Sequence, residues 1–490
     1  MKPVTAGLII SLVLGTTPYL ASAAPQDFDN DGVPNSLDPD FDGDGIPNVY
    51  EQYNDGIRWR FAADGAWDND GDGWSNAEEY RRVTNLNDPN SNPDMLTGPA
   101  LQKVFGFDAG VRSWFGVTAD VEGDWAVIGA SAAKVYRDLN GNLIEPYAAG
   151  AVYVYHRENG DWVLHDKLVP EMTDEVTGEP VLPTEFSGFG RSVALTLMDG
   201  HDYPTIAVSA ANIDSVFIFK APAGNWQQTG MIKGPVDDDF GVSLDLDGTT
   251  LAVGAPKTPH PDYIYYALSY GSVFIYDIHG PSDATAPQMI TELRHCENGM
   301  YCEFGTDLKL EGDTLAVTSP VQYEGRSASV FTGVDGIWEL QADLVSTLSD
   351  GDEWTGIALS GDRILLTEFG LSLFEMAGDI VEFTRDGNTW TETDVIFAAD
   401  LGASALGGAI ALSGDIALTT DDDGNVISLY RTGGTWVELG REVIAPESED
   451  IKDFLAVDAA AGTVLVGSPE DFDGGEKAGA AYFVDLNSIQ

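Results

Sequence analysis

A pattern of about 50 to 70 residues that recurs between residues 101 and 485 constrains the fold of this chain more than any other feature. The first unit begins at Phe115-Gly116, turns at Gly123-Asp124, continues in apolar strands over 125–130 and 150–155, and ends in a strand centred on Trp162. The later units begin at Phe189, Phe240, Phe304, Trp354, Leu406 and Phe454. The first six units each offer four short strands and the seventh offers three, and no amphipathic helix separates the units. We therefore predict an all-β fold, a seven-bladed β-propeller with one unit per blade.

The two ends of the repeat region favour a closed ring over a row of separate β-sandwiches. The seventh unit stops after its third strand, while residues 100–104, just before the first unit, have the pattern of a fourth strand. If this N-terminal strand completes the last blade, the ring closes and no open sheet edge is left at the seam. We therefore predict one propeller domain over residues 100–490, closed by its N-terminal strand.

The tryptophans of the fourth strands recur at a fixed place in the unit. That regularity favours packing between blades over a sugar-stacking ring. The residues concerned are Trp162, Trp226, Trp338, Trp390 and Trp436.

A second repeat, a short acidic loop, occupies the domain predicted over residues 24–96. Three loops carry acidic residues at positions 1, 3, 5 and 12 and glycine at position 6. Calcium takes six to eight oxygen ligands, and this spacing gathers those carboxylates and the backbone carbonyl of position 7 around one ion. The predicted ligands are Asp27, Asp29, Asp31, Val33 and Asp38 in the first loop, Asp40, Asp42, Asp44, Ile46 and Glu51 in the second, and Asp68, Asp70, Asp72, Trp74 and Glu79 in the third.

The regular spacing favours calcium as the cofactor over a solvated acidic linker, which would carry carboxylates without a register. The second and third loops are complete, with Asn48 and Asn76 at position 9. The first loop ends in Asp38, whose shorter side chain predicts a weaker site or one that shares Asp40 with its neighbour. Because the region has few apolar residues, we expect calcium binding to be coupled to its folding into loops with short helical turns.

The motifs of both regions resemble known repeat families. Phe240-Gly241 together with Gly254-Ala255-Pro256 is similar to the FG-GAP repeat of integrin alpha-chain propellers, and the other units match that repeat in part. The abutting Asp-x-Asp-x-Asp-Gly units of residues 27–44 resemble thrombospondin type 3 repeats. The first resemblance implies recognition or adhesion through loops on one face of the propeller, and the second implies a calcium-dependent stalk. Together they imply an interaction protein whose partner is an extracellular protein or glycan.

The N-terminus and the net charge indicate where the protein works. Residues 1–23 combine Lys2, an apolar run over 4–14 and the small residues of 21–23, which predicts a cleaved secretory signal. We therefore expect a secreted, extracellular or cell-surface protein, with the periplasm as an alternative. The net charge of −56 repels phosphate backbones and anionic lipids, so we expect neither nucleic-acid binding nor direct insertion into a membrane.

Cysteine usage is consistent with export. The chain has two cysteines, Cys296 and Cys302. In an exported protein this spacing predicts a local disulfide that closes residues 297–301. A metal pair is the less favoured alternative, because no further cysteine or suitably spaced histidine lies nearby.

Two other functions remain open. The sequence has neither a His-Glu-x-x-His nor a Gly-x-Ser-x-Gly motif, and its six histidines are scattered, so we do not expect an enzyme. A hydrolase of polysaccharide or phosphoester is one alternative, because chance carboxylate pairs abound among 80 acidic residues. A lectin-like head is the other, with candidate sugar-stacking residues at Tyr263, Tyr265, Tyr266 and Tyr270. Partial acidic loops at 138–142, 421–424 and 471–474 are either blade calcium sites or simple turns.

Overall fold

The computed structural model describes most of both predicted domains. The described residues are 28–29, 40–53, 57–58, 60–82, 84–87, 89, 101–106, 112–137, 143–173, 180–181, 186–222, 224–259, 269–280, 285–296, 302–319, 326–348, 353–369, 378–421, 425–442, 454–471 and 477–486. The predicted signal segment and four ligands of the first loop (Asp27, Asp31, Val33 and Asp38) lie outside these residues, as do Tyr263, Tyr265 and Tyr266.

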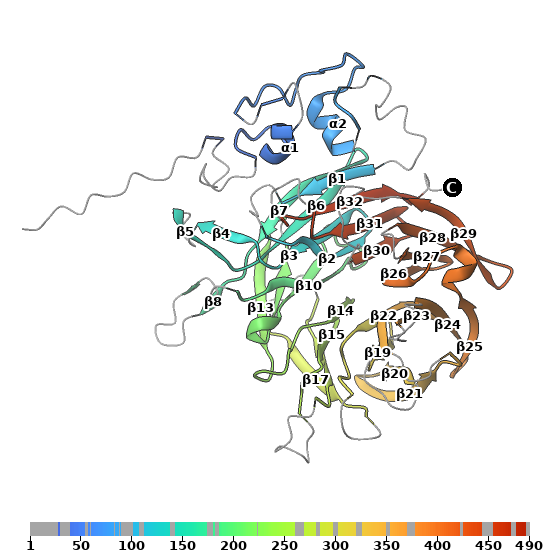
Figure 1. The fold of residues 1–490 in the computed structure, drawn as a ribbon. Coiled ribbons are helices and arrows are strands. Elements are labelled where there is room, and N and C mark those ends of the chain that lie inside the picture. The colour runs from blue at the N-terminus through green and yellow to red at the C-terminus, as the bar shows by residue number, and fades with distance from the viewer. Residues whose placement is uncertain are drawn as a thin grey trace, which may run out of the picture.

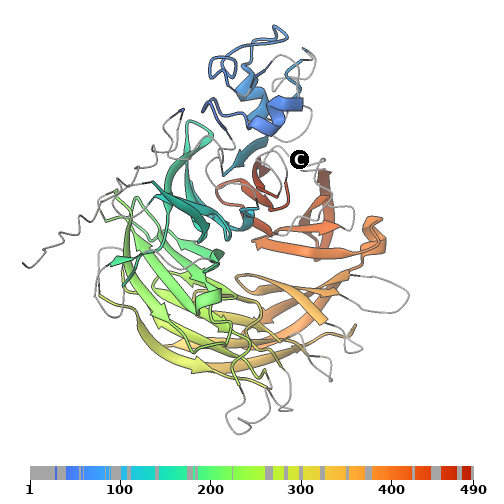
Figure 2. The same ribbon diagram turned by 60° about the vertical axis from the view of Figure 1, so that its left-hand side comes forward.

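Seven four-stranded antiparallel sheets follow one another around a ring (Figures 1 and 2). Blade 1 contains β2 (Phe115–Glu122), β3 (Trp125–Ala130), β6 (Ala151–Glu158) and β7 (Asp161–Leu168); blade 2 contains β10 (Phe189–Thr196), β11 (Thr205–Ala210), β12 (Ser215–Lys220) and β13 (Gln227–Lys233); blade 3 contains β14 (Leu244–Asp247), β15 (Thr250–Ala255), β16 (Ser272–Asp277) and β17 (Gln288–Leu293). Blade 4 contains β18 (Leu308–Glu311), β19 (Thr314–Thr318), β20 (Arg326–Val334) and β21 (Ile337–Val345); blade 5 contains β22 (Glu353–Ser360), β23 (Arg363–Phe369), β24 (Gly378–Asp386) and β25 (Thr389–Ile396); blade 6 contains β26 (Leu406–Ser413), β27 (Ile416–Asp421), β28 (Val426–Thr432) and β29 (Thr435–Glu442). Blade 7 contains β30 (Phe454–Asp458), β31 (Thr463–Ser468), β32 (Ala480–Asp485) and β1 (Leu101–Phe105). The predicted seven-bladed propeller is confirmed.

The remaining elements are small. Two short hairpins leave the first two blades: β4 (Lys134–Arg137) pairs with β5 (Leu143–Ala148), and β8 (Met172–Thr173) pairs with β9 (Pro180–Val181). The helices are α1 (Asn48–Tyr53) and α2 (Asn76–Arg82), with single 3-10 turns at η2 (Ala211–Ile213) and η3 (Ala398–Leu401). Among the described residues, no helix is both long and apolar enough to cross a membrane.

The N-terminal strand closes the ring, as predicted. β1 pairs antiparallel with β32, from Leu101 opposite Val484 to Phe105 opposite Ala480. The side chain of Gln102 then crosses to blade 1: its Nε2 donates to the carbonyl of Trp162 at 2.7 Å, and its Oε1 accepts from the N–H of Trp162 at 2.8 Å. The amide of Gln102 therefore pairs with β7 as a backbone peptide would and ties blade 7 to blade 1.

A buried polar group also anchors β1 in blade 7. The Lys103 ammonium lies 3.1 Å from an oxygen of Asp471, and the Tyr482 hydroxyl donates to the same oxygen at 2.9 Å. All three side chains are buried. Because a buried charge needs a partner, this cluster favours one position of β1 against the sheet.

One hydrogen bond per blade joins the inner strands in a closed circle. The last residue of each inner strand accepts a hydrogen bond from a backbone N–H at the equivalent turn of the next blade. Where that donor is glycine, it belongs to the turn that follows the inner strand, as in the Gly-Asp turn at Gly123. The seven pairs are Glu122 with Leu197, Thr196 with Gly248, Asp247 with Gly312, Glu311 with Gly361, Ser360 with Gly414, Ser413 with Ala459, and Asp458 with Gly123.

The Phe-Gly motif acts at the contacts between blades. Phe115 and Phe189 are fully buried, and the glycines that follow them have φ near +90°. A Cβ on Gly190 would lie 2.6 Å from the carbonyl oxygen of Ala151 in the preceding blade. Glycine is therefore required both for the backbone conformation and for the close approach of neighbouring blades.

The recurring tryptophans pack between blades, as predicted. Trp162 stacks on Phe483 of the preceding blade with ring centroids 4.4 Å apart. The Trp390 Nε1–H donates to the Gln341 side chain of the preceding blade at 2.7 Å. Arg363 of blade 5 lies over the ring of Trp436 in blade 6. These rings therefore fill blade seams.

The inner strands surround a polar cavity of about 360 Å³ on the propeller axis. Asp120, Asp245 and Asp307 line it together with Lys309. Each of the three aspartates accepts a hydrogen bond from the inner strand of the following blade, so these carboxylates are bound into the fold. Burial raises the pKa of Asp120 to about 6.

We predict that Gln102→Ala weakens the propeller seam. The substitution leaves the N–H and the carbonyl of Trp162 unpaired at a buried position, which should lower the free energy of unfolding by about 2 kcal/mol. Gln228 is the matched control, because its amide makes the same two bonds to the backbone of Glu171 at a more exposed position. Denaturant unfolding should show a smaller loss for Gln228→Ala than for Gln102→Ala, and equal losses would contradict the role given to Gln102.

We predict that Glu122 makes stability depend on pH. Burial raises the pKa of Glu122 from 4.5 to about 7, and Asp120 nearby adds to the shift. The folded state thus holds the proton more tightly, so this contribution to stability is complete below pH 4.5 and is lost as pH rises through about 7. Glu122→Gln keeps an acceptor for Leu197 and should flatten the stability profile between these values. Asp335→Asn, at an exposed turn, is the control; equal slopes in the two variants would refute the prediction.

Candidate metal centre

The acidic loops form a small unit against the closing strand of the propeller (Figures 1 and 2). Loop 40–51 leads into α1, and loop 68–79 leads into α2. Between them lies a small core of Ile46, Ile57, Tyr80 and Leu86. Because this core is small, the loops depend on polar interactions for their shape.

The two loops share the same internal hydrogen bonds. In each, the position-1 aspartate accepts from the N–H of the position-6 glycine: Asp40 from Gly45 at 3.0 Å, and Asp68 from Gly73 at 2.9 Å. These bonds curl the chain so that the acidic side chains of positions 3 and 5 converge. The register inferred from the sequence is therefore also the register of the folded loops.

The side chains of the position-9 asparagines stabilise the start of each loop. Asn48 accepts from the N–H of Phe41 at 3.0 Å, and Asn76 accepts from the N–H of Asn69 at 3.2 Å. In both loops the asparagine thus bonds to position 2 and fixes the start of the loop. The sequence pattern placed these residues but did not predict this use of their side chains.

Four carboxylates converge at loop 40–51. They belong to Asp42, Asp44, Glu51 and Asp64, each of which offers an oxygen within 4.8 Å of the others. Glu51 is 3% exposed and Asp64 is 0% exposed, and both oxygens of each are buried without a hydrogen-bond partner among the described residues. Buried oxygens of this kind are costly unless a cation binds them.

Asp64 is a site residue that the sequence analysis missed. It lies outside the twelve-residue loop, in the segment that links the two loops. The following residue, Gly65, packs directly against the cluster: a Cβ at this position would lie 2.5 Å from an oxygen of Asp44. A single Asp-Gly pair between loops resembles any acidic turn, so no spacing rule distinguishes it.

The electrostatics of this cluster show strong repulsion. Burial raises the pKa of Glu51 to about 9, with further contributions from Asp42 and Asp44, and burial raises the pKa of Asp44 to about 6. The pKa of Asp42 is raised for the same reason. A divalent cation at the centre would offset both burial and mutual repulsion, so the donor set fits a hard cation that prefers oxygen.

Loop 68–79 brings together Asp68, Asp70 and Asp72, with one oxygen of each within 4.8 Å of the others. Glu79 at position 12 is 0% exposed, and its Oε2 has no partner among the described residues. Its Oε1 accepts a hydrogen bond from Thr84. Burial and the charges of Asp70 and Asp72 raise the pKa of Glu79 to about 7. This second donor set also fits a hard cation.

Of the predicted ligands in the first loop, the structure describes Asp29. Its carboxylate lies against the second loop: a Cβ on Gly43 would be 2.6 Å from one of its oxygens. The side chain therefore belongs to the same unit as the loop at 40–51.

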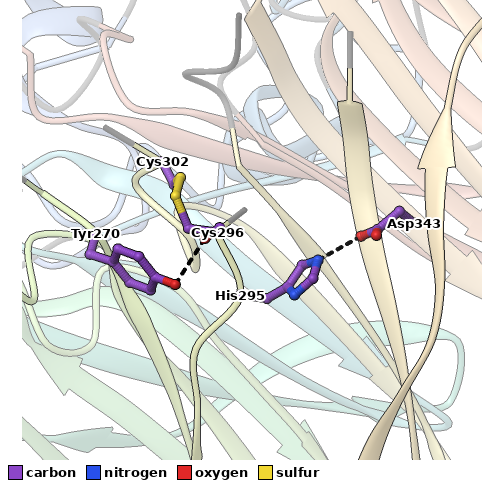
Figure 3. The surroundings of a disulfide bond; sticks show 5 residues. All are labelled: Tyr270, His295, Cys296, Cys302 and Asp343. Carbon is purple, nitrogen blue, oxygen red and sulfur yellow. Dashed lines mark hydrogen bonds and ion pairs between the residues drawn. A yellow bond between two sulfur atoms is a disulfide. The ribbon is translucent and has the colours of Figure 1, made fainter. Parts of the chain in front are cut away.

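The two cysteines form a disulfide, with Cα atoms 6.0 Å apart (Figure 3). The hydroxyl of Tyr270 donates to the carbonyl of Cys296 at 3.0 Å, and His295 lies 2.9 Å from Asp343 of blade 4. The bridge thus holds the turn between blades 3 and 4. Tyr270, a candidate sugar-stacking residue, uses its hydroxyl within this turn.

Two of the partial acidic loops in the blades have internal partners for their first residue. Asp421 accepts from the N–H of Asn425 at 2.8 Å and lies 3.1 Å from Arg441. Asp471 binds Lys103 and Tyr482. The other candidate, at 138–142, lies outside the described residues, as do 422–424 and 472–474. The carboxylates of Asp421 and Asp471 thus stabilise their blades.

The fold and the loops define this chain as a β-propeller with an attached unit of acidic loops. No protein-family model matches it, and no curated protein does. It is similar to the solved structures of the computationally designed protein Ika8 (14% identity, TM-score 0.41, 76% of this chain and 96% of that chain), of Sqt1 from Saccharomyces cerevisiae (10%, 0.44, 81% and 87%) and of a putative 6-phosphogluconolactonase from Bacteroides fragilis (12%, 0.41, 66% and 82%). The propeller assignment rests on the sheet order of the chain itself.

Proposed function

We propose that this protein is a calcium-binding interaction protein of the cell exterior. The observation that carries the proposal is the pair of acidic loops with one hydrogen-bond pattern and with buried carboxylate oxygens that have no hydrogen-bond partner within the described part of the chain. All the candidate ligands are oxygen atoms, the donors that calcium prefers. Asp42, Asp44, Glu51 and Asp64 would hold one ion, and Asp68, Asp70, Asp72 and Glu79 a second.

Calcium is favoured over magnesium by the nature of the donor set. Magnesium keeps several water molecules and usually takes one or two carboxylates, whereas calcium accepts a larger shell of protein oxygens. This site gathers four carboxylates, and those of Asp42, Glu51 and Asp64 are buried, which suits calcium better than a largely hydrated magnesium ion. The bound ion would supply positive charge that holds the loops together.

The propeller would be the head that recognises a partner. The resemblance of its Phe-Gly units to FG-GAP repeats and of the loops to thrombospondin type 3 repeats supports recognition or adhesion, with an extracellular protein or glycan as the partner. We propose no enzymatic activity. The signal-like segment 1–23 and the disulfide support an extracellular location.

The acidic loops would do more than act as a spacer, because they pack on the closing strand. The ring of Tyr80 in α2 lies 5.9 Å from that of Phe105 in β1, and the Lys103 ammonium lies over the Tyr80 ring. Arg82 pairs with Asp161 of blade 1. Ordering of the loops by calcium would therefore brace the seam where the propeller closes.

We predict that the full chain binds calcium at both loops. Glu51→Gln and Glu79→Gln should each reduce the number of ions bound by one in isothermal titration calorimetry, because each removes the acid that closes a shell. Glu78→Gln is the matched control: this neighbour is partly exposed and pairs with Arg81, so uptake should not change. Absence of calcium uptake by the wild-type protein would refute the proposed function.

We also predict that calcium slows hydrogen exchange at the seam. Backbone amides of β1 and β32 should become better protected when calcium is added, because the ordered α2 covers β1. Amides of β22–β25, on blade 5, are the internal control and should change little. In Phe105→Ala the gain at β1 should shrink. Equal exchange of β1 with calcium and with a chelator would contradict the bracing role.

A further inference from the structure

We propose that the two ion sites are linked through Asp64, so that an ion in loop 68–79 raises the affinity of the site around Glu51. This inference rests on the proposed calcium binding. It adds that occupancy of one site regulates the affinity of the other. The ligand concerned is calcium or another hard divalent cation. The link is built from Asp64, Gly65 and the first turn of α2.

The first step is the position of Asp64. Its carboxylate joins those of Asp42, Asp44 and Glu51, yet it comes from outside their loop. Both of its oxygens are buried without a hydrogen-bond partner among the described residues. The site is therefore complete only when the segment after α1 is correctly placed.

The second step is what places that segment. The side chain of Asn76 donates from Nδ2 to the carbonyl of Asp64 at 2.6 Å. The N–H of Ala77 donates to the carbonyl of Gly65 at 2.9 Å, and the N–H of Asn76 donates to that of Trp67 at 2.6 Å. Three hydrogen bonds from the first turn of α2 thus hold residues 64–67.

The third step is what orders α2. Asn76 is fully buried, and its Oδ1 accepts from Asn69 within loop 68–79. Glu79, one turn further along α2, is the acid that would close the ion shell of that loop. An ion there would draw Glu79 towards Asp70 and Asp72 and fix α2. Through its hydrogen bonds to residues 64–67, the ordered helix would then hold Asp64 in place at the other site. That site would bind its ion without a further loss of conformational entropy for this segment.

Repulsion between the ions does not outweigh this link. With Glu79 drawn in, each proposed site would hold four carboxylates, so a bound divalent ion would leave a formal charge of about −2 there. Each ion is more than balanced by its own ligands, so filling one site places no net positive charge beside the other. Coupling between two binding sites of this kind is typically about 5- to 150-fold in affinity.

The test is a cycle of calcium titrations on the full chain. Asp70→Asn with Glu79→Gln silences loop 68–79. We expect this change to weaken calcium binding at the site around Glu51 about tenfold, as measured by isothermal titration calorimetry. In an Asn76→Ala background, the same silencing should weaken that site clearly less than in the wild type, because the side-chain bond to Asp64 is already lost and only the backbone bonds to Gly65 and Trp67 remain.

Asn48→Ala is the matched control. It removes the same bond between positions 9 and 2, but from loop 40–51. In this background, silencing of loop 68–79 should still weaken the remaining site about tenfold. Far-UV circular dichroism of each variant confirms that the propeller is folded.

A second variant tests the link from the other side. Asp64→Asn keeps the carbonyl that Asn76 binds but removes the charged ligand. Because linkage is reciprocal, filling of the site around Glu51 should then no longer strengthen binding at loop 68–79.

The link is overturned if silencing changes the affinity of the remaining site less than about twofold in the wild-type background, or if the loss persists in full in Asn76→Ala. The absence of any calcium uptake would instead overturn the proposed function, and the link with it.

Discussion

The structure depends on closing a ring of seven sheets with one chain. The circle of hydrogen bonds at the inner strands shows how the constraint is met: every blade offers one acceptor to the next. The chemistry of that acceptor varies from Glu122 to Ser360, but its position does not. Six of the seven seams join blades that follow each other along the chain. The seventh is different, because β1 must come from the opposite end of the domain, and it carries the extra contacts of Gln102 and Lys103.

The overall architecture could be predicted from the sequence because blade packing requires particular residues at each repeat. The Phe-Gly pair is visible as a motif because a ring must be buried and a side chain at Gly190 would clash with the preceding blade. The closing strand could be predicted because a missing fourth strand leaves an open edge. Register within the acidic loops followed from the spacing of their carboxylates in the same way.

The contacts that sequence reasoning missed are single, long-range and without a repeat. Asp64 lies in an irregular segment, so no period points to it, and its place beside Glu51 depends on how α2 packs. The bond of Gln102 to Trp162 joins residues of different blades. Acidic residues also differ in whether a basic side chain pairs with them, which composition does not show. Asp421 and Asp471 pair with cations in the blades, whereas Glu51 and Asp64 have no such partner among the described residues.

The pairing of Leu101 with Val484 also has a consequence for the order of folding. Blades 1 to 6 are each built from contiguous chain and can form as they are synthesised, since their contacts are local. Blade 7 cannot, because its outer strand is made first and its partner last. β1 can pair with β32 only after the rest of the propeller has been made. Throughout that interval an unpaired strand edge is exposed. The chain can therefore pair with a wrong partner until β1 and β32 come together.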